Sequence, residues 1–203
     1  MGKLIVVVGN SGLGKTTFTR QLCRAYPFVT GMEQHQERPF QLAFSGNHSR
    51  YGLHNQVDYL LFRAGQELFI RRAEVPGVLD GGLELDFFVF TRYFHLRGYL
   101  TMAEYQLCER VYSFFRAVLP PPDLILRLTA PLEVVAARYA HRNRSLEIAR
   151  LEDLGQLEIL IDDWIGKVQD IPVVSIDASR EDPGYGVQIA KILPKLKSIL
   201  GVG

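Results

Sequence analysis

The residues that most clearly predict chemistry form a glycine-rich stretch near the start of the chain. This stretch is Gly9-Asn10-Ser11-Gly12-Leu13-Gly14-Lys15-Thr16-Thr17, and it matches the pattern GxxxxGK[ST] in full. It lies between an apolar run and a helical segment, which is the context that the pattern requires. Its glycines permit backbone conformations that a Cβ atom would block, so the N–H groups of the loop can converge on phosphate oxygens. We predict that the whole loop binds the triphosphate of ATP, with Lys15 at the β- and γ-phosphates and Thr16 at Mg²⁺.

An acidic residue further along the chain is a candidate for holding the Mg²⁺ of this site. Asp80 directly follows the apolar residues 77–79, where a P-loop protein places the acid that holds the Mg²⁺ shell. We therefore expect Asp80 near Thr16. The alternative is a plain acid that ends a strand in a turn with Gly81 and Gly82.

Four further residues are candidates for binding an acceptor. Glu33 follows the second predicted strand, where its carboxylate could accept the proton of an attacking hydroxyl. Gln56 and Arg63 are seven residues apart on one predicted helix and share a face, so both could meet one ligand. The amide of Gln56 offers a donor and an acceptor to a base edge, and an arginine beside Asp86 could fix both side chains. The alternatives are a surface glutamate and an ordinary polar helix face.

Arginines gather at the end of a later helix. Arg138 and Arg142 are four residues apart on one face, and Arg144 lies just beyond them. Fixed cations suit the charge that spreads over a phosphoryl group in transfer, and closure of such a lid would exclude water. The alternative is a solvated arginine-rich helix end.

Strands alternate with helices along the chain and would position these residues. Apolar runs predict strands at residues 4–8, 28–32, 77–79, 124–128 and 173–176. Helical periodicity predicts helices at residues 15–25, 53–73, 101–118, 147–168 and 187–200, with another opened by Pro131 and a kink or break at Pro194. Thr101 and Glu104 predict a capping box. This order predicts an α/β fold, a five-stranded parallel sheet between two helical layers, as one domain over residues 1–203.

Composition excludes several other classes of protein. The 203 residues are 47% hydrophobic and carry a net charge of +1, so no global basic field attracts a nucleic-acid polymer or a membrane. Cys23 and Cys108 form no CxxC pair, which argues against a zinc site or a disulfide framework. We find neither a signal peptide nor an apolar stretch of the roughly 20 residues that cross a bilayer. A cytoplasmic enzyme is expected.

From residue 3 to about residue 182 the sequence resembles the deoxynucleoside kinase family. The resemblance is carried by the P-loop, by Glu33 with Arg38-Pro39-Phe40, by the segment from Arg50 to Gln56, by Arg63, Asp80 and Asp86, and by Arg138, Arg142, Arg144 and Glu147. It implies a P-loop kinase fold with an arginine-rich lid, base-site roles for Gln56, Arg63 and Asp86, and binding of the sugar 3′-hydroxyl by Glu147. Glu147 could instead be a favourable acid at a helix start. The resemblance also implies an adenine-covering loop that begins at Asp177, and a homodimer formed through residues 53–73 and 101–118.

The sequence departs from the family at one motif. The family has an acid, an arginine and a serine where this chain has Asp80-Gly81-Gly82, so the arginine charge is missing. Arg63 or Arg92 could enter the space, the acceptor could be unusual, or catalysis could be weak. The leading hypothesis is ATP-dependent phosphorylation of the 5′-hydroxyl of deoxyadenosine, deoxyguanosine or deoxycytidine. The alternatives are a nucleoside monophosphate kinase similar to thymidylate kinase, and a non-catalytic regulatory protein that binds nucleotide.

Overall fold

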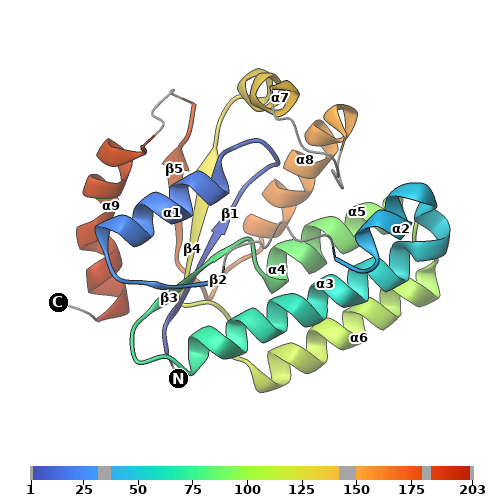
Figure 1. The fold of residues 1–203 in the computed structure, drawn as a ribbon, viewed down its shortest axis with the longest axis horizontal. Helices are drawn as coiled ribbons and strands as arrows, with labels where there is room; N and C mark the ends of the chain where they lie inside the picture. Colours follow the sequence, from blue (N-terminus) through green and yellow to red (C-terminus); the bar gives the residue numbers. More distant parts are fainter. Residues whose placement is uncertain (1, 32–37, 142–149, 180–183, 202–203) are drawn as a thin grey trace.

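The computed structural model describes residues 2–31, 38–141, 150–179 and 184–201. Its centre is a parallel sheet with the strand order β2-β3-β1-β4-β5 (Figure 1). The strands are β1 (Leu4–Val8), β2 (Val29–Gly31), β3 (Gly77–Asp80), β4 (Leu124–Thr129) and β5 (Val173–Asp177). The five predicted strands are confirmed, and their ends shift by at most one residue.

The central strand β1 separates two apolar layers. Ile5 and Val7 face one cluster with Phe18 and Leu22 of α1 (Lys15–Ala25) and several apolar residues of α9 (Gly186–Leu200). Leu4, Val6 and Val8 face the other cluster, which α3 (His48–Arg71), α6 (Met102–Val118) and α8 (Leu154–Ile165) complete. Figure 1 shows α1 and α9 on one side of the sheet, α3, α6 and α8 on the other, and α7 at its upper end. This alternation of side chains is why a strand without polar residues is stable here.

Helix α3 begins earlier than predicted. The sequence indicated a start at residue 53, but the helix starts at His48, after Asn47. The side chain of Asn47 accepts a hydrogen bond from the N–H of Arg50 at 3.0 Å, which caps the first turn. The helix therefore extends by more than a turn over polar residues that carry no apolar period. The capping box of α6 at Thr101 and Glu104 is confirmed.

Two other helix predictions need correction. Helix α8 begins at Leu154 after a short 3₁₀ turn (Leu151–Asp153) and ends at Ile165, so the described part is shorter than the predicted range 147–168. Pro194 does not divide α9, which continues from Gly186 to Leu200. Helix α7 (Leu132–Ala140) starts after Pro131, as predicted.

Four short helices near the acceptor residues were not predicted from the sequence. These are α2 (Gln41–Gly46), α4 (Leu83–Leu85), a π-helix (Asp86–Thr91) and α5 (Arg92–Leu96). They are too short for a clear apolar period, and the π-helix breaks the period that α4 and α5 would share. Within the described residues, no helix combines the length and apolarity that crossing a membrane requires.

Candidate active site

The P-loop lies between β1 and α1, at the carboxyl edge of the sheet. Gly9, Gly12 and Gly14 have φ angles of 146°, 88° and 81°, which are conformations that favour glycine. A Cβ atom at Gly9 would lie 2.7 Å from the carbonyl oxygen of Leu128, so this position also lacks space. The Nζ atom of Lys15 lies 2.9 Å from the carbonyl oxygen of Gly9 and donates to it. The predicted loop is thus present, with its lysine folded over it.

The two predicted metal-side residues are in contact. The hydroxyl of Thr16 donates a hydrogen bond to Oδ2 of Asp80. The parallel pairing of β1 with β3 brings this about, because Val7 lies opposite Asp80 and the P-loop begins just after β1. A hydroxyl beside a buried carboxylate is an oxygen donor set that fits Mg²⁺.

Tyr185, which lies outside the P-loop motif, helps to hold the P-loop in place. Tyr185, which precedes α9, donates its hydroxyl to the carbonyl oxygen of Leu13 at 2.8 Å. The same hydroxyl lies 2.9 Å from the position of a Cβ atom at Gly14, and its ring packs edge-on against Phe18. Tyr185 has φ 48°, which is unusual for a residue with a side chain. No motif marks this tyrosine, because its role depends on a contact across 172 positions of the chain.

Asn10 connects the P-loop to α8. Its Nδ2 donates to the carbonyl oxygen of Leu154 at 2.8 Å and to Oε2 of Glu158 at 2.9 Å. Its Oδ1 accepts from the N–H of Ser11 at 2.8 Å. The side chain of Asn10 is therefore bonded on both sides, and it fixes the second residue of the loop.

The predicted acceptor residues converge on the segment that follows β3. Nε of Arg63 donates to Oδ2 of Asp86 at 2.8 Å, and Nη1 of Arg63 donates to the carbonyl oxygen of Asp80 at 2.9 Å. Nε2 of Gln56 donates to the carbonyl oxygen of Asp86 at 2.9 Å. All four residues are buried. Arg63 thus joins the predicted metal-side acid to the predicted base-site acid.

The space beside Gly81 is taken by one of the two arginines that the sequence suggested. Nη2 of Arg63 lies 2.9 Å from the position of a Cβ atom at Gly81, which has φ 86°. Arg92 is engaged elsewhere, because its guanidinium pairs with Asp163 of α8. Arg63 is therefore the cation that the Gly81 position admits.

Known proteins resemble this chain over most of its length. The model of the deoxynucleoside kinase family matches residues 5–192 of the chain. The chain belongs to the deoxynucleoside kinase family. It is therefore a phosphotransferase that uses ATP to phosphorylate an alcohol group of a deoxynucleoside.

Two similar proteins are named as deoxynucleoside kinases. The kinase is 25% identical over 179 residues to a deoxyadenosine/deoxycytidine kinase of Bacillus subtilis strain 168, across 85% of this chain and 81% of the relative. Its fold matches that of a deoxyadenosine kinase from M. mycoides, solved with the products dCMP and a flexible dCDP, with a TM-score of 0.81. That match covers 96% of this chain and 99% of the other at 22% identity. The predicted α/β P-loop fold is confirmed.

The described residues include only part of the predicted lid and adenine loop. Nη1 of Arg138 donates to the carbonyl oxygen of Ala178 at 2.5 Å, and Nη2 donates to that of Ser179 at 3.3 Å. Oδ1 of Asp177 accepts from the N–H of Ser179 at 2.8 Å. Arg138 thus lies against the loop after β5, beside Asp177. Glu33, Arg142, Arg144 and Glu147 lie outside the described residues, so the arginine-rich lid stays a prediction.

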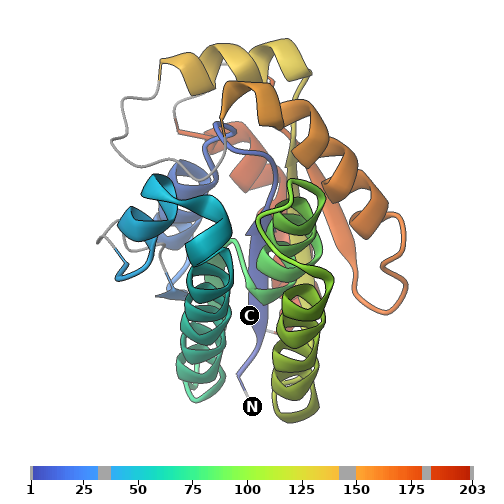
Figure 2. The same ribbon diagram turned by 90° about the vertical axis from the view of Figure 1, so that its right-hand side faces the viewer.

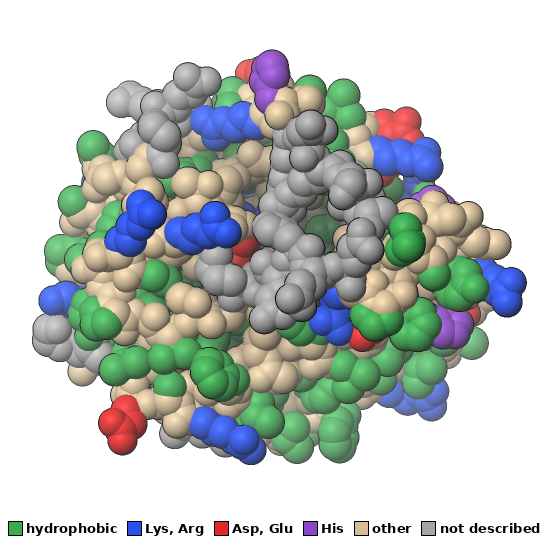
Figure 3. Space-filling view, in the orientation of Figure 1, with side chains coloured by type: hydrophobic (Ala, Val, Ile, Leu, Met, Phe, Trp, Pro, Cys, Tyr) green, Lys and Arg blue, Asp and Glu red, His purple; other side chains and the backbone are tan. Residues whose placement is uncertain are grey.

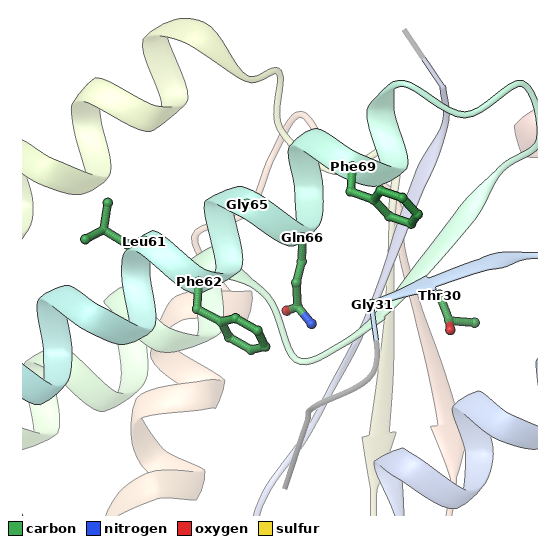
Figure 4. Close-up of a pocket in the computed structure, with 7 residues that line it drawn as sticks. All are labelled: Thr30, Gly31, Leu61, Phe62, Gly65, Gln66 and Phe69. Atoms are coloured by element: carbon green, nitrogen blue, oxygen red, sulfur yellow. The ribbon is translucent and has the colours of Figure 1, made fainter. Parts of the chain in front are cut away.

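A groove of about 550 Å³ lies beside the acceptor residues, between α3 and the edge strand β2 (Figure 4). Its lining consists of Thr30, Gly31, Leu61, Phe62, Gly65, Gln66 and Phe69. Figure 4 shows Gln66 pointing from α3 toward Gly31. Oε1 of Gln66 accepts from Nη1 of Arg63 at 3.1 Å, so one lining residue of the groove contacts the arginine that bonds Asp80 and Asp86. The lining includes neither Gln56 nor Asp86, and we assign no role in catalysis to it.

Proposed function

We propose that this kinase transfers the γ-phosphoryl group of Mg·ATP to the 5′-hydroxyl of deoxyadenosine, deoxyguanosine or deoxycytidine. The observation that carries the proposal is the buried pair of Arg63 and Asp86, bonded at 2.8 Å, with Gln56 bonded to the same segment. The name of the Bacillus subtilis relative, a deoxyadenosine/deoxycytidine kinase, supports two of these acceptors.

The chemistry of the bases explains why this pair suits these nucleosides. A carboxylate accepts hydrogen bonds only, and a guanidinium donates only. Adenine, cytosine and guanine each carry an exocyclic amine that donates, and adenine and guanine carry an acceptor at N7. Asp86 would accept from the amine, whereas Arg63 and Gln56 would address ring acceptors. Thymine has no exocyclic amine and presents a carbonyl instead, so it fits this pair less well.

The phosphate side follows from the P-loop. The N–H groups of Gly9 to Thr17 and the ammonium of Lys15 would hold the triphosphate, and Asp177 with Arg138 would lie beside the adenine. Thr16 and Asp80 would hold Mg²⁺, which neutralises charge on the phosphate oxygens when it is bound. Both residues supply oxygen atoms, the ligands that Mg²⁺ prefers, and these atoms lie close together.

The groups that act on the hydroxyl are the remaining predicted residues. Glu33 would accept the proton of the 5′-hydroxyl, and Glu147 would bind the sugar 3′-hydroxyl. Arg138, Arg142 and Arg144 would stabilise the transferring phosphoryl group.

A coupled ADP-release assay tests the proposal. We expect stimulation by deoxyadenosine, deoxyguanosine or deoxycytidine, little by thymidine, and dependence on Mg²⁺. Each nucleoside is compared with its monophosphate, because a monophosphate kinase would prefer the latter. Mg·ATP binding without stimulation by any acceptor would favour the regulatory alternative and would refute our proposal.

We also propose that the kinase forms a homodimer through α3 and α6 and works in the cytoplasm. These helices lie side by side (Figure 2), and apolar side chains gather over their region in Figure 3. Leu61, Phe69, Phe114 and Val118 are all more than half exposed on them, which a monomer rarely leaves uncovered. Free ATP is abundant in the cytoplasm, and cell fractionation tests that location.

A further inference from the structure

Three charged side chains form a buried cluster behind the acceptor residues. Glu67 of α3 has no exposed surface, and Glu84 of α4 is 3% exposed. Arg116 of α6 lies between them. Its Nη2 donates to Oε2 of Glu67, and its Nε lies 3.4 Å from Oε1 of Glu84 without a hydrogen bond. Two carboxylates therefore share one guanidinium.

The other neighbouring groups only partly offset the charge of the second carboxylate. The charge of Arg71 on α3 attracts both carboxylates, but its guanidinium bonds to Asp123 and to the carbonyl oxygens of Gly2, Pro120 and Pro121. Tyr112 of α6 is neutral in the physiological range, since burial raises the pKa of its hydroxyl. Among the described residues, neither oxygen of Glu84 has a hydrogen-bond partner, and neither does Oε1 of Glu67.

A second ionised carboxylate in such a place is unfavourable, because burial removes its water and the contacts that Glu84 gains in return are weak: Nε of Arg116 at 3.4 Å and its own backbone N–H. One bound proton removes the excess charge. Burial raises the pKa of Glu84 to about 7, with a further contribution from the charge of Glu67. Burial likewise raises the pKa of Glu67, against the attraction of Arg116. The two carboxyls are close enough to titrate as a pair.

The cluster is built into the elements that carry the acceptor residues. Glu67 is four residues after Arg63, one turn along α3. Glu84 lies in the segment between Asp80 and Asp86, which Arg63 bonds at both ends. A change in the position of Glu84 relative to α3 would therefore also change the geometry of the bonds between Arg63 and Asp86.

We propose that Glu67 and Glu84 share one proton and act as positioning residues, which keep the segment from Asp80 to Asp86 against α3 and so maintain nucleoside affinity. Loss of the proton creates two neighbouring anions in the interior and pushes α4 away from α3. The inference rests on the proposed function, since it assigns nucleoside binding to Arg63 and Asp86.

The test measures the KM for deoxyadenosine and for ATP as pH is raised. We expect the nucleoside KM of the unaltered kinase to rise roughly three- to tenfold between about pH 6 and about pH 8.5, while the KM for ATP changes little. Glu84→Gln keeps the shape without the charge, so its nucleoside KM stays flat over this range. Glu109→Gln, on the exposed face of α6, is the matched control and keeps the rise.

Two results would overturn the proposal: a nucleoside KM that does not respond to pH in the unaltered kinase, or a Glu84→Gln variant that responds as before. A second measurement does not need activity. In carboxyl-carbon NMR of glutamate-labelled protein, a resonance that titrates near neutral pH should be present and should vanish in Glu84→Gln. If that resonance is found but no deoxynucleoside is phosphorylated, the proposed function fails while the shared proton stands. If no such resonance is found, the shared proton is refuted.

Discussion

Arg63 and Gly81 occupy complementary positions. Nη2 of Arg63 lies 2.9 Å from where a Cβ atom of residue 81 would be, and Nη1 of the same arginine reaches the carbonyl oxygen of Asp80 at 2.9 Å. The missing side chain of Gly81 is therefore what lets Arg63 hold both Asp80 and Asp86. In this kinase, an arginine from α3 takes the space that a side chain at position 81 would occupy.

Substitution of Gly81 tests this relationship. In Gly81→Ala the methyl group meets the guanidinium, so we expect the nucleoside KM to rise about tenfold, the equivalent of roughly 1.4 kcal/mol. The φ angle of 86° should also cost about 1 kcal/mol of stability. Steady-state kinetics and urea denaturation measure the two effects.

Gly98 supplies the matched control. It has φ 70°, but a Cβ atom there meets nothing within 4 Å. We expect Gly98→Ala to show a similar loss of stability and an unchanged nucleoside KM. An equal KM effect in both variants would mean that backbone strain, and not contact with Arg63, explains the result.

Replacement of Glu33 tests the proposed general base. Glu33→Gln keeps hydrogen bonding but cannot accept a proton, so we expect kcat to fall by about 10²- to 10⁴-fold. Binding of Mg·ATP, measured by calorimetry, should be retained because the P-loop is unaltered. Turnover at the wild-type level would remove Glu33 from this role.

Removal of the Tyr185 hydroxyl tests how the P-loop is held. Tyr185→Phe loses the bond to the carbonyl oxygen of Leu13 and leaves that acceptor buried, which should cost about 1–2 kcal/mol and lower Tm by several degrees. We expect the KM for ATP to rise with little change in the nucleoside KM. Tyr26→Phe, at the end of α1, is the control, and a comparable loss in both variants would argue against a specific role for Tyr185.

The buried Glu84 predicts a pH dependence of stability with a definite sign. Burial raises the pKa of Glu84 from 4.5 to about 7 in the folded chain. The folded state thus binds more protons in this window, and stability falls as pH rises from about 4.5 to about 7, by up to roughly 3 kcal/mol. Burial raises the pKa of Asp123, but hydrogen bonds from Lys3, the N–H of Leu4 and Arg71 stabilise its anion and lower the pKa below its usual value. This group therefore affects stability only in more acidic solution.

Denaturation by urea at several pH values measures this slope. Glu84→Gln should flatten it, since the amide does not titrate. If the pH dependence of stability persists in Glu84→Gln, another group must cause it.

Substitution of Phe114 tests the proposed dimer. Phe114 is 65% exposed on α6, and Phe114→Glu would place a charge in an apolar interface, so we expect monomers in light scattering after size exclusion. Val187→Glu, at an exposed apolar position of α9 on the other side of the sheet, should leave the dimer intact. A monomeric unaltered kinase would refute the proposal.

Short-range patterns of the sequence determined a large part of this protein. The P-loop, the five strands, the fold class and the capping box of α6 were all predicted, because each depends on neighbouring residues or on apolar periodicity. The spacing of Gln56 and Arg63 also predicted that they share one face of α3, because a helix fixes which residues share a face, and both side chains bond to Asp86.

Only the tertiary structure decided which distant groups meet. It selected Arg63 over Arg92 beside Gly81, brought Tyr185 under the P-loop, and buried Glu84 with Glu67 and Arg116. No local rule encodes these contacts, because a side chain's charge, partner and exposure depend on which elements pack against it. The sequence pattern determines helices, strands and turns locally. The charge states and pairings of buried side chains are decided only when the packed elements exclude water.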